Sequence, residues 1–124
     1  IGVGEVVFGV LNKNGQVDID LTHLLAKEAL PMKVTFHKAI DDTIDIILEL
    51  KRLSKVKEVT SILTSGGKDS ALNGQDTIKQ IITEFSSRFN IISAGGITDI
   101  NFDLVHNSIK GTEYHGKRIV GQLG

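Results

Sequence analysis

The stretch KVTFHKAID, residues 33–41, carries the pattern on which the prediction of the fold depends. Side chains alternate along a strand, so Val34 and Phe36 point to one side. Thr35 and His37 then point to the other. A strand buried on both faces of an open parallel sheet is almost wholly apolar. A strand with one apolar face and one face of mixed polar and apolar residues is instead typical of a barrel. In a barrel, helices cover the outside and polar side chains line the inside near the mouth.

Segments rich in β-branched residues recur along the chain at roughly the spacing of one strand–helix unit, on the order of 30 residues. We predict strands at Glu5–Val10, Lys33–His37, Glu58–Thr64, Asn90–Ala94 and Thr112–His115. Helical patterns fill the four intervals, most clearly where Ile78, Ile81 and Phe85 share one face. The capping residues that we expect at the helix ends are Asp18, Asp42 or Thr43, and Thr98 or Asp99 at N-termini, and Gly111 at the C-terminus of the fourth helix. This order predicts parallel strands joined by right-handed crossovers.

Two architectures fit such an order. One is an open, doubly wound sheet of five strands, for which 124 residues suffice. The other is part of a (βα)8 barrel, which takes about 250 residues when complete. The alternation in residues 33–41 favours the second. The predicted fold class is therefore α/β, a partial TIM-type (βα)8 barrel with five parallel strands and four intervening helices, in one domain over residues 1–124.

The composition excludes several classes of function. The 14 Lys and Arg residues balance 15 Asp and Glu residues, so no strong field attracts nucleic acid or an anionic membrane. The chain has no Cys, which excludes disulfides, zinc-thiolate sites and a thiol nucleophile within it. No apolar run approaches the roughly 20 residues of a membrane helix, and no signal peptide is recognisable. We expect a soluble, intracellular domain.

Ligands of parallel α/β folds bind at the carboxyl ends of the strands, so residues there are the functional candidates. His37 and His115 both end predicted strands on the mixed face, and we expect their rings to face one shared hollow. Neutral imidazoles could act there as acid or base, or bind a soft or borderline metal. Asp41 is a third candidate for the catalytic or ligand role, with helix capping as the alternative. Both histidines could instead be hydrogen-bonded structural residues. The other two histidines, His23 and His106, lie within predicted helices, and we expect both on the surface.

Glycine pairs after two successive strands predict an anion site. The expected donors are Thr64, Ser65, Gly66, Gly67, Gly95 and Gly96. Residues without a Cβ let backbone N–H groups approach an anion closely, and the two hydroxyls add donors. A helix that begins soon after the second pair would favour the same charge. The alternative is that the glycines only form tight turns.

The order and spacing of these motifs resemble the CutC copper homeostasis family. The matching segments are VVFGVL at 6–11, VTFHKAID at 34–41, ILTSGG at 62–67, GGI at 95–97 and EYHG at 113–116. The resemblance implies a TIM-type barrel of the cytoplasm that is linked to copper handling, with Cu(I) binding and without an established reaction. The chain departs from the family at Lys38, where Arg is usual, and at Ile40, where Phe is usual. It also has Ser93–Gly96 where the family has Pro-Gly-Gly-Gly.

The resemblance begins at what should be the fourth strand of the family's barrel. The cysteines proposed there as copper ligands belong to the preceding part, so a Cu(I) site here would depend on His37 and His115, with Met32 as a further candidate. Such a site would be weak, since Cu(I) prefers soft sulfur ligands. Five of eight strands also leave two unpaired edges, which is an aggregation hazard. A fragment of a longer chain, an assembly of copies that covers the edges, and a natural truncated product remain alternatives.

The sequence thus predicts a cytoplasmic copper homeostasis protein of CutC type. Its partners would be a copper ion or a small anionic ligand, with further copies of the chain at the open edges, and neither nucleic acid nor membrane. The alternative is a TIM-barrel enzyme that acts on a small phosphorylated or carboxylated molecule. The glycine loops would hold that molecule, and His37 or His115 would act as acid or base. A third hypothesis is an inert fragment.

Overall fold

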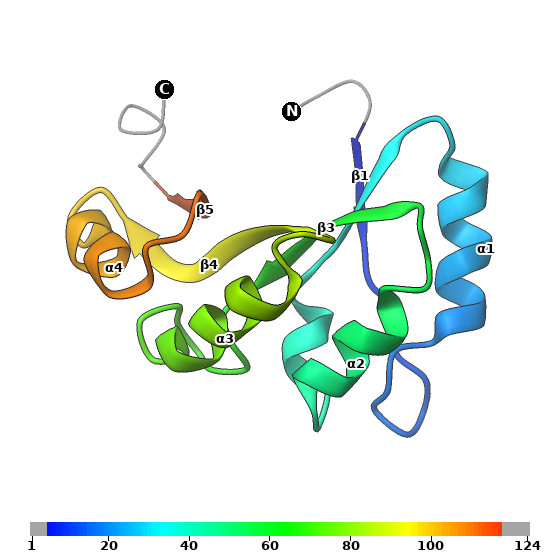
Figure 1. Cartoon of the computed structure of the whole chain (residues 1–124), viewed down its shortest axis with the longest axis horizontal. Helices are drawn as coiled ribbons and strands as arrows, with labels where there is room; N and C mark the ends of the chain where they lie inside the picture. Colours follow the sequence, from blue (N-terminus) through cyan, green and yellow to red (C-terminus); the bar gives the residue numbers. More distant parts are fainter. Residues whose placement is uncertain (1–4, 118–124) are drawn as a thin grey trace.

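The computed structural model describes residues 5–117, in which five strands alternate with four α-helices (Figure 1). The elements are β1 (Glu5–Phe8), α1 (Ile19–Ala29), β2 (Lys33–Phe36), the 3₁₀ turn η1 (Lys38–Asp42), α2 (Ile46–Leu53), β3 (Val59–Thr64), α3 (Gln75–Phe85), β4 (Asn90–Thr98), α4 (Phe102–Ile109) and β5 (Glu113–Lys117). The predicted order of elements is confirmed. The strand ends shift by a few residues, most of all in β4, which runs on through both glycines to Thr98.

The strands form one parallel sheet in the order β1-β2-β3-β4-β5. A doubly wound sheet reverses its strand order at a switch point, and this sheet has no reversal among the described strands. Sequential order with crossovers of one hand puts every helix on the same face. Figure 1 shows this arrangement, with α1, α2, α3 and α4 in an arc along the outer side of the curved sheet. Of the two predicted architectures, the order supports the barrel.

The core lies between the outer face of the sheet and the helices. Val34 and Phe36, predicted to share the apolar side of β2, are both fully buried there. The opposite, inner face is more open at the edge of the sheet. Val7 of β1 lies beside Thr35 in the register, and its side chain is 57% exposed. The inner face therefore remains partly uncovered, as expected of an incomplete barrel.

The helix caps agree with the sequence prediction at α1 and differ at α2. Asp18 caps α1 by accepting a hydrogen bond from the Leu21 amide. The cap of α2 is Asp45, where Asp42 or Thr43 was predicted. The reason is that η1 occupies residues 38–42 and delays the start of the helix. This turn holds the functional candidates that follow β2.

The fourth helix also begins later than predicted. Its N-cap residue is Asn101, where Thr98 or Asp99 was expected, because β4 continues to Thr98. At its other end Lys110 takes a left-handed conformation, with φ of 56°, directly before the predicted capping residue Gly111. These boundaries place the second glycine pair inside a strand.

Arg88 clamps the loop between α2 and β3. Its guanidinium donates to three carbonyl oxygens, those of Ser54 at 3.0 Å, Val56 at 2.7 Å and Val59 at 2.8 Å. Partial burial lowers the pKa of Arg88 from its ordinary value by desolvation of the cation. This single side chain therefore fixes the entry into the central strand β3.

Candidate functional site

Two hollows at the carboxyl ends of the strands are lined by the predicted histidines, and their volumes are about 590 Å³ and 630 Å³. The first hollow is lined by residues 37–39, 41, 42, 65 and 67–69, and the second by residues 38, 94–98 and 115. Lys38 lines both hollows, whereas His37 lines only the first and His115 only the second. The two rings thus lie in neighbouring hollows rather than in the single hollow that the sequence predicted.

His37 is held at the mouth of the first hollow by a local hydrogen bond and by the space beside Gly9. Its Nδ1 accepts a hydrogen bond from the Ala39 amide at 2.9 Å, which caps η1. A Cβ atom on Gly9 would lie 2.7 Å from His37 Cε1, so the glycine leaves room for the ring. Because Nδ1 accepts a bond, the neutral ring carries its proton on Nε2. His37 therefore presents an N–H donor to a ligand while the cap is intact.

Asp41 occupies the loop that the sequence predicted as an anion site. Its Oδ1 accepts from the Thr64 hydroxyl at 2.6 Å and from the Gly67 amide at 3.1 Å, and its Oδ2 accepts from the Ser65 amide at 2.9 Å. The Gly66 amide is also used, since it donates to Thr64 Oγ1 at 2.9 Å. Three of the six residues expected to hold an external anion, Thr64, Ser65 and Gly67, are thus engaged by a carboxylate of the same chain.

The Ser65 hydroxyl links this loop to its own turn. Its Oγ lies 2.6 Å from the carbonyl oxygen of Lys68 and 3.0 Å from Asp41 Oδ2. One hydroxyl carries one proton, and the shorter contact identifies the Lys68 carbonyl as its main acceptor. Asp41 therefore receives three well-formed hydrogen bonds. They tie η1 to the end of β3 and give the first hollow a rigid wall.

The second glycine pair shapes the second hollow by close packing. Gly95 has φ of 102°, and a Cβ atom there would lie 3.0 Å from Ser65 Cβ. Asn101 ties the same segment down, because its Nδ2 donates to the Gly96 carbonyl at 2.8 Å and its Oδ1 accepts from the Thr98 amide at 2.8 Å. Asn101 was not among the residues predicted from the sequence, although it follows β4 closely and stands at a helix start.

His115 lies in β5, beside Ala94 of β4, and its side chain is exposed. Among residues 5–117, no group of three or more His, Asp or Glu side chains could hold a metal ion. Met32 precedes β2, at the opposite end of that strand from His37, and so lies away from both hollows. The imidazoles of His37 and His115 are therefore the soft or borderline ligands at the carboxyl ends of the described strands.

His23 and His106, predicted as surface residues of helices, are both exposed, which confirms that prediction. His106 Nδ1 lies 2.6 Å from the Tyr114 hydroxyl oxygen, which also accepts from the Gly111 amide at 2.8 Å. Partial burial raises the pKa of Tyr114, and the Gly111 hydrogen bond opposes part of that rise.

None of the helices in the described range is long and apolar enough to span a bilayer.

Comparison with known proteins adds to this geometry. A model of the CutC family matches residues 1–120. The mouse protein named copper homeostasis protein cutC homolog is 36% identical over 114 residues, which cover 92% of this chain and 42% of the mouse protein. The human homologue of the same name is 35% identical over 114 residues, which cover 92% of this chain and 41% of that protein. The CutC family protein of Pasteurella multocida is 34% identical over 115 residues, which cover 93% of this chain and 47% of that protein.

A solved structure shares the fold. The crystal structure described as the copper homeostasis protein CutC from Streptococcus agalactiae superposes with a TM-score of 0.82 at 24% identity. The match covers 92% of this chain and 56% of that one. The predicted partial TIM-type barrel is thereby confirmed. The chain spans less than half the length of the three curated relatives above.

Proposed function

The chain belongs to the CutC family, and we propose that it has a copper-handling role in copper homeostasis. The observation that carries the proposal is the family match over residues 1–120, together with the names of the mouse and human relatives. The chain spans under half the length of those two relatives. We therefore extend the role of a whole relative to this chain only as a proposal. In such a role copper is the cargo of the protein and not a resident cofactor.

Within this role, His37 and His115 are the proposed contacts for Cu(I). Imidazole nitrogen suits copper, although thiolate and thioether sulfur bind Cu(I) more strongly. The chain has no Cys, and no three-residue cluster of metal-binding side chains occurs among its described residues. Each imidazole is therefore suited to weak, exchangeable binding of Cu(I) rather than to permanent retention.

The cap at His37 makes copper binding weaker still. Coordination through Nε2 needs the lone pair of that atom, so the ring proton must move to Nδ1. Nδ1–H would then face the Ala39 N–H, and the hydrogen bond between them would be lost. Loss of one such bond costs about 0.5–1.5 kcal/mol. Cu(I) binding at His37 is thus coupled to opening of the η1 cap, a coupling that does not extend to His115.

A competition titration tests the proposal. The chain competes for Cu(I) with a weak colorimetric chelator under anaerobic conditions, as the unaltered protein and as the variants His37→Ala and His115→Ala. We expect each variant to bind Cu(I) more weakly than the unaltered chain. His23→Ala, which alters an imidazole at the opposite ends of the strands, should leave the affinity unchanged. Equal affinity in all four proteins would contradict the proposed contacts.

The enzyme alternative is not favoured. The mouse and human relatives are named for copper homeostasis rather than for a reaction. The carboxylate of Asp41 also fills the loop in which a phosphate or carboxylate of a substrate was expected. A cytoplasmic location is part of the proposal and is supported by the family resemblance. Cell fractionation with an antibody to the chain tests it, and recovery in the membrane or secreted fraction would oppose it.

A further inference from the structure

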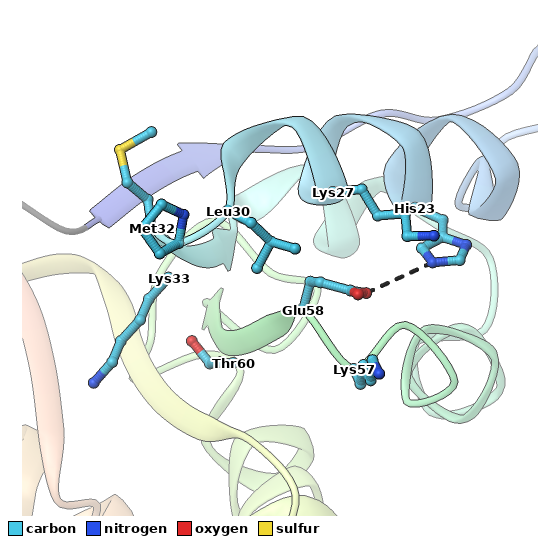
Figure 2. A pocket seen from close by; sticks show the side chains of 9 residues that line it. His23, Lys27, Leu30, Met32, Lys33, Lys57, Glu58 and Thr60 are labelled. Atoms are coloured by element: carbon cyan, nitrogen blue, oxygen red, sulfur yellow. Dashed lines mark ion pairs between the residues drawn. The ribbon is translucent and has the colours of Figure 1, made fainter.

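A hollow of about 720 Å³ lies at the amino ends of β2 and β3 (Figure 2). The acidic residue in its lining is Glu58, whose buried carboxylate lies 3.7 Å from His23 Nε2, as the dashed line in Figure 2 marks. The partner of this carboxylate thus belongs to the chain itself. A group that stays free to react lies elsewhere, in the turn between β1 and α1.

Asparagine followed by glycine occurs twice in the sequence, at Asn14-Gly15 and at Asn73-Gly74. In such a pair the backbone nitrogen of the glycine can attack the side-chain carbonyl carbon of the asparagine, because glycine has no Cβ to hinder the approach. The new C–N bond closes a succinimide ring, and ammonia leaves with the proton that the glycine nitrogen gives up. Water then opens the ring at either carbonyl carbon. The product is aspartate or isoaspartate, whose backbone is one carbon atom longer.

Asn14 has the freedom that this reaction needs. It is exposed, and Figure 1 shows its turn as a loop that projects beyond the end of α1. Its side-chain amide has no hydrogen-bond partner among the described residues. Gly15 has φ of 76°, and a Cβ atom there would meet no atom within 4 Å. The Gly15 amide donates to the Asn12 carbonyl at 3.0 Å, and such a bond in an exposed turn opens at little cost.

Asn73 is exposed as well, but the fold holds the atoms that would react. Its Nδ2 donates to Asp69 Oδ1 at 2.8 Å, and the Gly74 amide donates to the Ser70 carbonyl at 3.0 Å. Gly74 is buried, and a Cβ atom there would lie 1.9 Å from the Ser65 carbonyl oxygen. The backbone at Gly74 therefore has no space in which to turn towards the Asn73 side chain.

From this contrast we propose that Asn14 is a site of spontaneous modification, at which the folded chain reacts with water to form aspartate and isoaspartate. The same fold protects Asn73. The reaction is independent of copper. Its product adds a negative charge to a hollow of about 310 Å³ that residue 14 lines together with Asp45 and Glu49. Isoaspartate would also lengthen the turn in which Asn12 Oδ1 accepts from the amides of residues 14 and 16, at 2.9 Å and 3.1 Å.

The experiment is an incubation of the purified chain at mildly alkaline pH, followed by peptide mapping with mass spectrometry. We expect Asn14 to convert about tenfold or more faster than Asn73 in the folded chain. Tenfold corresponds to about 1.4 kcal/mol in the barrier, which is the size of one or two lost hydrogen bonds. In guanidinium chloride both asparagines should convert at similar rates, because the protection of Asn73 is lost with the fold. Equal rates in the folded chain, or no conversion of Asn14 there, overturns the proposal.

Two variants with a matched change identify the reacting residue. Asn14→Gln places the amide one carbon further from the backbone, and the acidic form of the folded chain should then no longer accumulate in ion-exchange chromatography. Asn73→Gln makes the same change at the protected pair and should leave the rate of accumulation as it is. Both positions are exposed, so neither change disturbs the core. An acidic form that accumulates equally fast in Asn14→Gln overturns the proposal.

Discussion

Asp41→Asn should destabilise the chain more than any other conservative change at the carboxyl ends of the strands. The carboxylate accepts bonds from the Thr64 hydroxyl, the Gly67 amide and the Ser65 amide. Asparagine keeps one oxygen, which can continue to serve Thr64 and Gly67. Its NH₂ group would face the Ser65 N–H, so that bond is lost and the other two lose their charge assistance. A lost bond to a charged group costs about 1.5–3 kcal/mol, and an unsatisfied buried N–H adds about 1–3 kcal/mol. We expect a total loss of about 3 kcal/mol in the free energy of unfolding.

The assay is urea unfolding followed by circular dichroism, with midpoint and slope fitted separately. Asp42→Asn is the matched control, because Asp42 is the exposed neighbour in the same turn. It should change the free energy of unfolding by less than about 0.5 kcal/mol. Thr64→Val in both backgrounds completes a double-mutant cycle, and its effect should shrink when Asp41 is already replaced. Equal stability of Asp41→Asn and Asp42→Asn would refute the carboxylate's role as the internal anion of this loop.

Four further predictions concern other parts of the chain. Arg88→Lys should lower the free energy of unfolding, measured in urea, by about 2–4 kcal/mol. The reason is that a single ammonium group cannot keep all three carbonyl contacts of the guanidinium group. A loss below about 0.5 kcal/mol would show that Arg88 does not stabilise the loop between α2 and β3. Tyr114 is the only tyrosine, so alkaline difference absorbance reports its pKa directly, and we expect a value above the ordinary 10.0. As pH rises through the ordinary value, the unfolded chain loses this proton first, so stability should fall until the folded pKa is passed, and Tyr114→Phe should remove that part of the loss. Gly9→Ala should displace the His37 ring, since the added Cβ would lie 2.7 Å from Cε1, and the ring resonances should shift while Gly15→Ala leaves them in place. Finally, if copies of the chain cover the open edges at β1 and β5, light scattering should give a mass that grows with concentration, and a constant mass of 13.4 kDa would reject that assembly.

The sequence predicted the fold well because the signals of a βα unit are local. Alternation in β2 and the helical stripe of α3 both lie within a few residues, and both appear as predicted. Asp45, the N-cap of α2, stands directly before the helical pattern, so it could have been found from the local sequence. The predicted caps, Asp42 or Thr43, lie three or two residues before it. Such errors of boundary do not change the topology.

The arrangement of the candidate site was less predictable because its contacts are long-range. Asp41 meets Thr64 across 23 residues of chain, and nothing in the sequence around either residue indicates that pair. The space beside His37 depends on Gly9, which belongs to the preceding unit. The separation of His37 and His115 into two hollows likewise depends on strand register and on the position of Lys38.

The most direct test of the copper proposal is the response of the imidazole and amide resonances to Cu(I). The account predicts that ring nitrogen signals of His37 and His115 shift, and that the Ala39 amide shifts with His37 as the cap opens. The rings of His23 and His106 should keep their positions. Shifts confined to His23 or His106, or binding at His37 with an unchanged Ala39 amide, would contradict the account.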